Sequence, residues 1–234
     1  MIIETHALTK AYGLQPVLRK IDLGIERGEF VALLGANGSG KSTLLRLLCA
    51  LSKPTAGTLK VGGWELPKEA AAVRSQIGLV SHKSLVYDNL TANENLLFFA
   101  RVYGLNDIDG RIKRGLERVG LGKRGGDLVR TYSRGMLQRL SIARALLHDP
   151  DVLLLDEPYT GLDQDASGIL DNLLQQAHGD GKTVVMVTHE LDRAQRLAQR
   201  AIIISRGTIV LDAPMSTIDY LPARYTEVTG MTTR

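Results

Sequence analysis

Gly35-Ala36-Asn37-Gly38-Ser39-Gly40-Lys41-Ser42 follows an apolar run at residues 30–34 and precedes a helical pattern at residues 43–50. A strand that turns through glycines into a helix directs backbone N–H groups and the positive end of a helix dipole at one place, where a polyphosphate can bind. Lys41 can reach the β- and γ-phosphates, and the Ser42 hydroxyl can ligate Mg²⁺. A glycine-rich turn that matches by chance is the alternative, and the strand–loop–helix setting disfavours it. The stretch predicts a nucleoside triphosphate site.

Composition narrows the class of protein. The chain has 234 residues, of which 44% are hydrophobic, and a formal net charge of +4; this suffices for one large α/β domain with a real core. No window approaches the roughly 18 consecutive apolar residues of a membrane span, and the N-terminus has no pattern of an export signal. The single cysteine, Cys49, is interpreted as a small buried hydrophobe in a reducing cytosol. Because basic and acidic residues are interspersed, we expect no nucleic acid partner.

The order of patterns predicts the fold class. Short β-rich runs occupy the first third of the chain, at residues 2–8, 21–25, 30–34, 58–61 and 77–80. Helical patterns follow at residues 95–103, behind a capping box of Thr91 and Glu94, and at residues 111–119 and 133–147. Strands at residues 152–155, 183–187, 201–205 and 208–211 then alternate with helices at residues 165–178 and 191–199. Such alternation predicts an α/β fold with parallel strands and crossover helices, and a small antiparallel edge near the N-terminus.

The same patterns suggest how the chain is divided. We expect a single domain over residues 1–234, with a nucleotide-binding core at residues 1–83 and 149–234 and a helical subdomain at residues 84–148. No repeat and no second phosphate loop interrupts this organisation.

Polar side chains follow two of the predicted core strands. Asp156 and Glu157 end an all-apolar strand, and His189 follows another. Because ligands gather at the carboxyl ends of parallel strands, Asp156 is expected near the Mg²⁺ on Ser42, and Glu157 is expected to polarise the attacking water. His189 can hydrogen-bond the γ-phosphate and hold that water, although a lone histidine is more often a satisfied core or surface residue. An acidic strand end that feeds a turn is the alternative for the two carboxylates.

Taken together, these residues resemble the ATP-binding subunits of ABC transporters over essentially the whole chain. Residues 35–42 look like Walker A, residues 153–157 like Walker B with its catalytic glutamate, Gly161-Leu162-Asp163 like the D-loop, and His189 like the switch histidine. The resemblance implies a P-loop NTPase core of the ABC ATPase type, with an N-terminal antiparallel β-subdomain and a helical insertion subdomain. The residues implied to bind ATP are Tyr12, which stacks on adenine, and Gly35, Asn37, Gly38, Ser39, Gly40, Lys41, Ser42, Thr43, Ser133, Gly135 and Asp163.

Residues 132–140, Tyr-Ser-Arg-Gly-Met-Leu-Gln-Arg-Leu, occupy the place of the family's Leu-Ser-Gly-Gly-Gln signature. Ser133 and Gly135 match, whereas Tyr132, Arg134 and Met136 depart. Ser133 is a good N-cap that can meet a phosphate at a helix N-terminus, and Arg134 adds a positive charge there. Without the Walker motifs, an ordinary capped amphipathic helix would be the better interpretation.

The resemblance also implies partners. In the family, the signature of one subunit closes on the Walker A site of another, so we expect a dimer with an identical copy or a related ATPase chain that hydrolyses ATP with Mg²⁺. We further expect integral membrane permease subunits as partners and a peripheral location on the cytoplasmic face of the cell membrane.

His82 stands where the family normally has a glutamine that touches Mg²⁺ and the attacking water, so the resemblance gives it a metal-binding and catalytic role. Together with the pattern Leu-Thr-Ala-x-Glu-Asn-Leu at residues 90–96, it resembles the ATPase subunit of the cytochrome c maturation haem exporter. We therefore expect haem export; the alternative is the ATPase subunit of a drug, lipid or other ABC-2-type exporter, which shares part of the pattern. A soluble ABC ATPase acting on ribosomes or DNA, and a nucleotide-gated scaffold with weak hydrolysis, are further alternatives.

Overall fold

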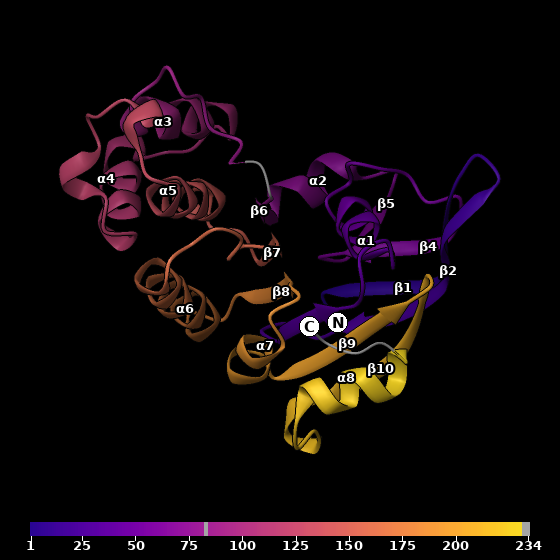
Figure 1. Cartoon of the computed structure of the whole chain (residues 1–234). Coiled ribbons are helices and arrows are strands. Elements are labelled where there is room, and N and C mark those ends of the chain that lie inside the picture. Colours follow the sequence, from indigo (N-terminus) through magenta and orange to yellow (C-terminus); the bar gives the residue numbers. More distant parts are fainter. Residues whose placement is uncertain (82–83, 231–234) are drawn as a thin grey trace.

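A six-stranded sheet forms the centre of the protein. The computed structural model describes residues 1–81 and 84–230 (Figure 1). The strand order is β10–β9–β3–β8–β7–β6, and every neighbouring pair is parallel except β9 and β10, which are antiparallel. The strands are β3 (Phe30–Leu34), β6 (Ile77–Val80), β7 (Val152–Asp156), β8 (Thr183–Val187), β9 (Arg200–Ser205) and β10 (Thr208–Pro214). The predicted parallel sheet with crossover helices is confirmed.

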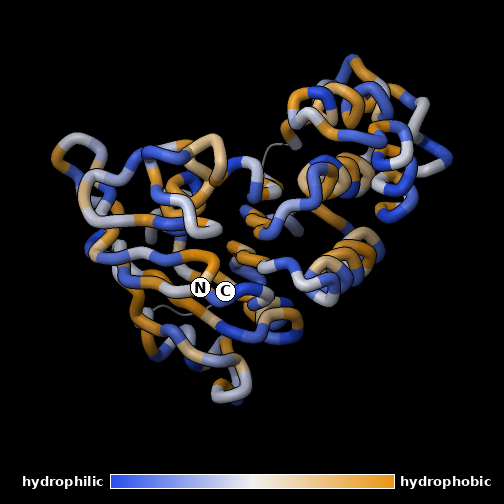
Figure 2. Tube along the Cα trace, turned by 180° about the vertical axis from the view of Figure 1, so that it is seen from behind, coloured by the Kyte–Doolittle hydropathy of each residue, from blue (hydrophilic) through white to orange (hydrophobic). Residues whose placement is uncertain are grey.

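Both faces of this sheet are covered, which explains why its central strands are apolar at every position. In β3, Phe30, Ala32 and Leu34 face one hydrophobic cluster, and Val31 and Leu33 face the other. A parallel sheet buried on both faces needs apolar side chains on both. Helix α1 (Lys41–Leu48) packs on the second face, and α6 (Gln164–Gly179), α7 (Leu191–Leu197) and α8 (Leu221–Thr229) contribute to the first. In Figure 2, hydrophobic residues recur along the strands of the sheet, and hydrophobic and hydrophilic residues alternate along the helices of the lobe.

A second, four-stranded antiparallel sheet replaces the small antiparallel edge that the sequence predicts. Its order is β2–β1–β4–β5, with β1 (Ile3–Tyr12), β2 (Gln15–Ile25), β4 (Ala56–Val61) and β5 (Trp64–Leu66). The hairpin of β1 and β2 extends well beyond the predicted runs, because its distal half is exposed and irregular in register, so it carries no clean alternation. Strand β5, the short helix α2 (Ala70–Ser75) and α8 also escaped prediction, since each is brief or weakly patterned.

Three helices form a lobe beside the sheet. They are α3 (Ala92–Val102), α4 (Ile108–Arg118) and α5 (Arg134–Leu146), and the chain also has the 3-10 turns η1 (Gly122–Arg124), η2 (Val129–Thr131) and η3 (Met215–Thr217). The predicted capping box is present: Glu94 N donates to Thr91 Oγ1 at 3.2 Å, and Thr91 N donates to Glu94 Oε2 at 2.7 Å. Leu140 and Ile142 of α5 belong to the cluster on the first face of the sheet, so α5 joins the lobe to the core.

Within residues 1–81 and 84–230, every helix falls short of the length and apolar character that a bilayer crossing requires.

The two-faced core allows a stability test on α6. Leu174 is fully buried in the first cluster, whereas Leu14, at the tip of the β1–β2 hairpin, is fully exposed. Leu174→Ala should lower the free energy of unfolding by about 2–5 kcal/mol, because it removes buried methyl groups and leaves a cavity. Leu14→Ala should change it by less than about 0.5 kcal/mol. Urea unfolding followed by circular dichroism measures both, and similar losses in the two variants would contradict the assigned core.

His148 lies where the helical lobe meets the sheet, and its ring stacks on Tyr103 at 4.1 Å between centroids. Burial lowers the pKa of His148 from 6.5 to about 4. Between these values the unfolded chain binds a proton that the folded chain does not, so stability is full above pH 6.5 and falls as the pH drops toward 4.

We therefore expect the free energy of unfolding to fall by about 1–2 kcal/mol more in the parent than in His148→Gln between pH 6.5 and 4.5. Urea titrations at several pH values measure this difference. If the free energy of unfolding depended on pH equally in the two proteins, the lowered pKa of His148 in the folded state would be contradicted.

Candidate nucleotide-hydrolysis site

The predicted site residues meet because three adjacent strands end at one level. In the sheet register, Leu33 of β3 pairs with Val187 of β8, and Val187 pairs with Asp156 of β7. The phosphate loop follows β3, His189 follows β8, and Glu157 follows β7. Because β8 lies between β3 and β7, the histidine is placed between the loop and the carboxylates.

Two glycines of the phosphate loop are required by their surroundings. Gly35 has a φ of +150°, and a Cβ there would lie 2.3 Å from the carbonyl oxygen of Ile204. Gly40 has a φ of +115°, and a Cβ would lie 2.6 Å from Leu18 Cδ2. Only glycine fits both the backbone angle and the space. These two close contacts could not be predicted from the sequence. Leu18 and Ile204 lie far from the loop in the chain and have the pattern of ordinary strand residues.

Lys41 is held inside its own loop. Its Nζ donates to the carbonyl oxygens of Gly35 at 2.7 Å and Ala36 at 3.0 Å, and its side chain is nearly buried. Burial lowers the pKa of Lys41, and the nearby charges of Glu157 and Asp156 oppose that shift. The lysine therefore stands among acceptors at the position where the sequence predicts a phosphate-binding cation.

Ser42 and Asp156 each carry an oxygen atom that can bind a metal ion, and the two side chains are in contact. Ser42 Oγ donates to Asp156 Oδ1 at 3.3 Å. Hard oxygen ligands suit Mg²⁺, which is commonly bound through one or two protein oxygens together with phosphate oxygens and water. Within residues 1–81 and 84–230, no group of three or more His, Cys, Asp or Glu side chains could hold a metal ion by itself. The residues present fit an ion shared with a nucleotide.

Glu157 and His189 are in direct contact. Glu157 Oε2 and His189 Nδ1 lie 2.8 Å apart. Glu157 has a φ of +52°, an unusual backbone conformation for a residue other than glycine, and its N–H donates to the Val187 carbonyl at 2.9 Å. The strand end thus turns the carboxylate toward the histidine. A neutral imidazole that donates from Nδ1 keeps an acceptor at Nε2, so the pair can orient and polarise one water molecule.

The signature segment begins α5 as the sequence predicts. Ser133 caps the helix, with its Oγ accepting from Met136 N at 3.3 Å. Asp163 caps α6 in the same way, accepting from Ala166 N at 2.8 Å. The two caps belong to the signature and to the D-loop, and they lie at the starts of neighbouring helices in Figure 1.

Arg134, which the sequence predicts to add a positive charge near the start of α5, also has a contact within its own chain. Its guanidinium lies over Gly161 of the same chain, where a Cβ would meet Arg134 Nε at 2.6 Å. Because Gly161 has no side chain, it leaves room for this contact. The substituted signature residue therefore packs against the D-loop.

The remaining predicted residues fall in different places. The Tyr12 ring is about half exposed and open to stacking, and Lys10 Nζ lies 4.9 Å from its centroid, a contact that no sequence signal indicated. Cys49 is buried, and burial raises its pKa to about 12, which confirms the interpretation as a small hydrophobe. His82 lies outside the residues that the structure describes.

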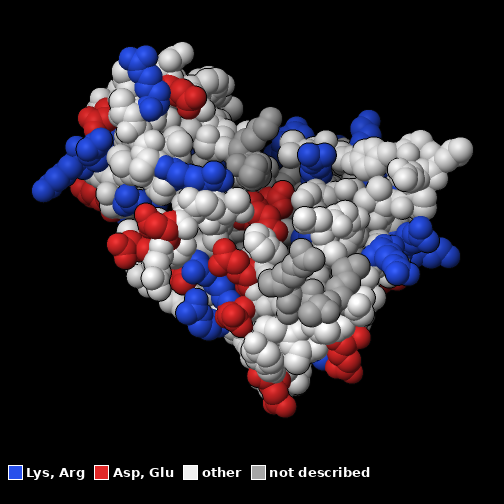
Figure 3. Space-filling model, in the orientation of Figure 1, with Lys and Arg blue, Asp and Glu red and all other residues white. Residues whose placement is uncertain are grey.

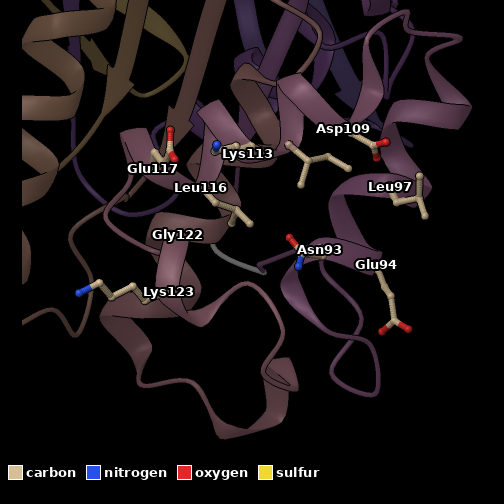
Figure 4. Close-up of a pocket in the computed structure, with 10 residues that line it drawn as sticks. Asn93, Glu94, Leu97, Asp109, Lys113, Leu116, Glu117, Gly122 and Lys123 are labelled. Atoms are coloured by element: carbon tan, nitrogen blue, oxygen red, sulfur yellow. The ribbon is translucent and has the colours of Figure 1, made fainter.

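Cavities help to locate the site. A cavity of about 750 Å³ lies among α3, α4 and η1, where Leu97, Leu116 and Lys123 contribute to its lining (Figure 4). None of its lining residues belongs to the predicted site. A smaller cavity of about 300 Å³ includes Ser42 and Asp156. Of the predicted nucleotide residues, Ser42 and Asp156 therefore line a cavity together.

Comparison with known proteins now identifies the family. Residues 18–160 match the family model described as ABC transporter. This chain belongs to the ABC transporter family.

The ABC relatives include several bacterial ATP-binding proteins. The ABC transporter ATP-binding protein NatA of Bacillus subtilis (strain 168) is 40% identical over 82% of this chain and 80% of its own length. The linearmycin resistance ATP-binding protein LnrL of the same strain is 34% identical, covering 89% and 68%. The bacitracin transport ATP-binding protein BcrA of Enterococcus faecalis is 35% identical, covering 97% and 73%.

Solved ABC structures agree with the fold. A structure described as the dimeric post-hydrolysis state of the ATP-binding cassette MJ0796 bound to ADP and Pi has a TM-score of 0.83 and 29% identity, covering 91% of this chain and 98% of that one. The P-loop NTPase fold of the ABC ATPases is confirmed, and ATP hydrolysis coupled to transport is the activity of this family.

The relatives correct the expectation of haem export. Several are named for linearmycin resistance, Nod factor export or bacitracin transport, and none of these names refers to cytochrome c maturation. The prediction rested on a short pattern around His82, which other exporter ATPases share in part. The drug or lipid exporter that the sequence left as an alternative fits better.

The contact between Glu157 and His189 generates a test of this ABC ATPase. Glu157→Gln keeps the shape of the side chain but removes the carboxylate that polarises water, so kcat should fall by about 10²- to 10⁴-fold. ATP binding should remain, and the ATP-bound dimer should accumulate. Phosphate release and gel filtration with ATP and Mg²⁺ measure these effects.

The control is Glu227→Gln, which alters a carboxylate that pairs with Arg224 on α8, away from the site. Its kcat should match the parent. A monomeric Glu157→Gln protein under saturating ATP would contradict the shared site.

Proposed function

We propose that this ABC ATPase is the motor subunit of an exporter, in which two ATP-binding subunits close around ATP and drive a separate membrane permease. The observation that carries the proposal is the pairing of Glu157 with His189 beside the Ser42–Asp156 pair. These four side chains supply a water-activating group and a metal-binding group at one edge of the sheet, as hydrolysis of a nucleoside triphosphate requires.

Each residue has a role in this proposal. The phosphate loop binds the triphosphate through its backbone N–H groups, and Lys41 contacts the β- and γ-phosphates. Ser42 and Asp156 hold Mg²⁺, which neutralises charge on the phosphate oxygens. Glu157 polarises the attacking water, and His189 orients that water against the γ-phosphate.

A second subunit completes the site. Ser133 and Gly135 lie at the N-terminus of α5, where free N–H groups and the helix dipole favour an anion. We infer that they meet the γ-phosphate bound to the other subunit, which is either an identical copy or a related ATPase. The dimeric MJ0796 cassette bound to ADP and Pi is similar in fold and supports this arrangement.

The permease is proposed to dock on the helical lobe. Residues 96–99 read as one apolar run, but their environments differ: Leu96 is fully buried, whereas Phe98 is 41% exposed. Phe98 lies edge-on to Tyr87 at 5.3 Å and to Phe99 at 5.2 Å. We call Tyr87, Phe98 and Phe99 the aromatic surface. A half-exposed aromatic cluster of this kind suits the apolar face of a cytoplasmic permease helix, which would hold the protein on the cytoplasmic side of the membrane.

The exported molecule is proposed to be an antibiotic-like or lipid-like compound. Support comes from the names of the relatives, which refer to linearmycin, Nod factor and bacitracin. An ATPase that acts on ribosomes or DNA is a weaker candidate, because basic and acidic side chains are interspersed on the face that Figure 3 shows. Co-purification with membranes, rather than with nucleic acid, separates the two.

The aromatic surface provides the test of coupling. When the chain is co-expressed with a membrane permease that it drives, Phe98→Ser should reduce export at least tenfold, because the docking helix loses a hot-spot contact of about 2 kcal/mol. ATP hydrolysis by the isolated dimer should change by less than twofold. Export from vesicles and phosphate release measure the two activities.

Tyr220→Ser is the matched control, since Tyr220 is an exposed aromatic residue next to α8. It should leave both activities intact. Parallel loss of export and basal hydrolysis in Phe98→Ser would exclude a docking role for the aromatic surface.

A further inference from the structure

Arg144 is a cation in the interior of the protein. Its side chain lies on α5 with 8% of the residue exposed, and burial lowers its pKa. Within residues 1–81 and 84–230, no salt bridge joins it to a carboxylate. An interior charge without a counter-ion is costly, so the two contacts that hold it are informative.

The first contact is with the catalytic sheet. Arg144 Nη2 donates to the carbonyl oxygen of Leu79 in β6. Because β6 is an edge strand, some of its backbone groups have no partner strand, and the guanidinium serves as one. Leu79 pairs in register with Leu154 of β7, two residues before Asp156. The arginine therefore holds the strand next to the one that carries the metal-binding carboxylate.

The second contact is with the aromatic surface. Arg144 Cζ lies 5.3 Å from the ring centroid of Phe99, within cation–π range. Phe99 packs edge-on against Phe98 and lies 6.5 Å from Tyr87. One planar guanidinium thus contacts both Phe99 of the aromatic surface and the Leu79 carbonyl at the edge of the sheet.

We propose that Arg144 is a positioning residue that couples the aromatic surface to the nucleotide site. When ATP closes the site and moves β7 and β6, the guanidinium follows the Leu79 carbonyl and shifts the Phe99 ring; a displacement of the ring acts in the opposite direction. This inference rests on the proposed docking function of the aromatic surface, but the coupling itself belongs to this chain alone and can be measured without a permease.

The experiment places a fluorescent reporter on the aromatic surface. The chain has one tryptophan, Trp64, so Trp64→Phe combined with Phe98→Trp gives a single reporter there, and Glu157→Gln holds the ATP-bound state. In this reporter protein, addition of ATP and Mg²⁺ should shift the tryptophan emission. Arg144→Met, which keeps an unbranched apolar stem but removes the guanidinium and both of its contacts, should abolish at least three quarters of that shift, while the ATP affinity changes less than threefold.

Arg139→Met is the matched control. Arg139 also lies on α5 and also donates to a backbone carbonyl, that of Val119 at 3.1 Å, but it has no contact with the aromatic surface among those described. It should keep the full emission shift. A second variant, Phe99→Leu, leaves the Leu79 contact in place and removes the ring, so it tests the coupling even if Arg144→Met does not fold; it should lose the shift as well.

A full emission shift in folded Arg144→Met, or in Phe99→Leu, would overturn the proposal. So would a reporter protein that binds ATP and dimerises without any emission shift. Those results would leave permease docking untouched, whereas loss of export in Phe98→Ser concerns docking alone, so failure of this inference and failure of the proposed function are distinguishable.

Discussion

The parallel backbone ladder of β3, β8 and β7 is the constraint on which the site depends. Parallel strands in register end at the same edge of a sheet, so residues more than a hundred positions apart in the sequence are brought to one place by main-chain hydrogen bonds. Leu33, Val187 and Asp156 share one level of the ladder. This register brings Glu157 into contact with His189, and it also brings Ser42 close to Asp156. A shift in register would separate these pairs although every side chain remained.

The sequence predicted the parts of the protein that depend on local chemistry. The phosphate loop, the capping box of Thr91 and Glu94, and the carboxylates after β7 all carry fixed spacings with a physical reason, and the structure contains them. Side-chain environments within an apolar run were not predictable: Leu96 and Phe98 are equally hydrophobic, yet only three-dimensional packing buries the first and exposes the second. The long β1–β2 hairpin escaped for a related reason, because exposed and irregular strands need no alternation.

Contacts between segments that are distant in the chain could not be predicted from the sequence. Nothing in its neighbourhood marks Arg144 as a residue that touches both β6 and α3, and nothing marks Leu18 as the neighbour of Gly40. The haem assignment failed for the opposite reason, since a short local pattern was asked to specify a substrate. In ABC systems the ATPase subunit carries the hydrolytic chemistry, so its residues contain little information about what is moved.

The position of Lys41 has a consequence for how nucleotide is received. Its ammonium already has two acceptors within the loop, the carbonyls of Gly35 and Ala36. These contacts preorganise the loop within its own chain, which reduces the conformational entropy that phosphate binding costs. The phosphate must compete with these internal acceptors for the same donor. The affinity therefore depends on the difference between two states: Lys41 bonded to the loop carbonyls, and Lys41 bonded to a phosphate. A polyanion can displace the carbonyls more readily than a weakly charged molecule can.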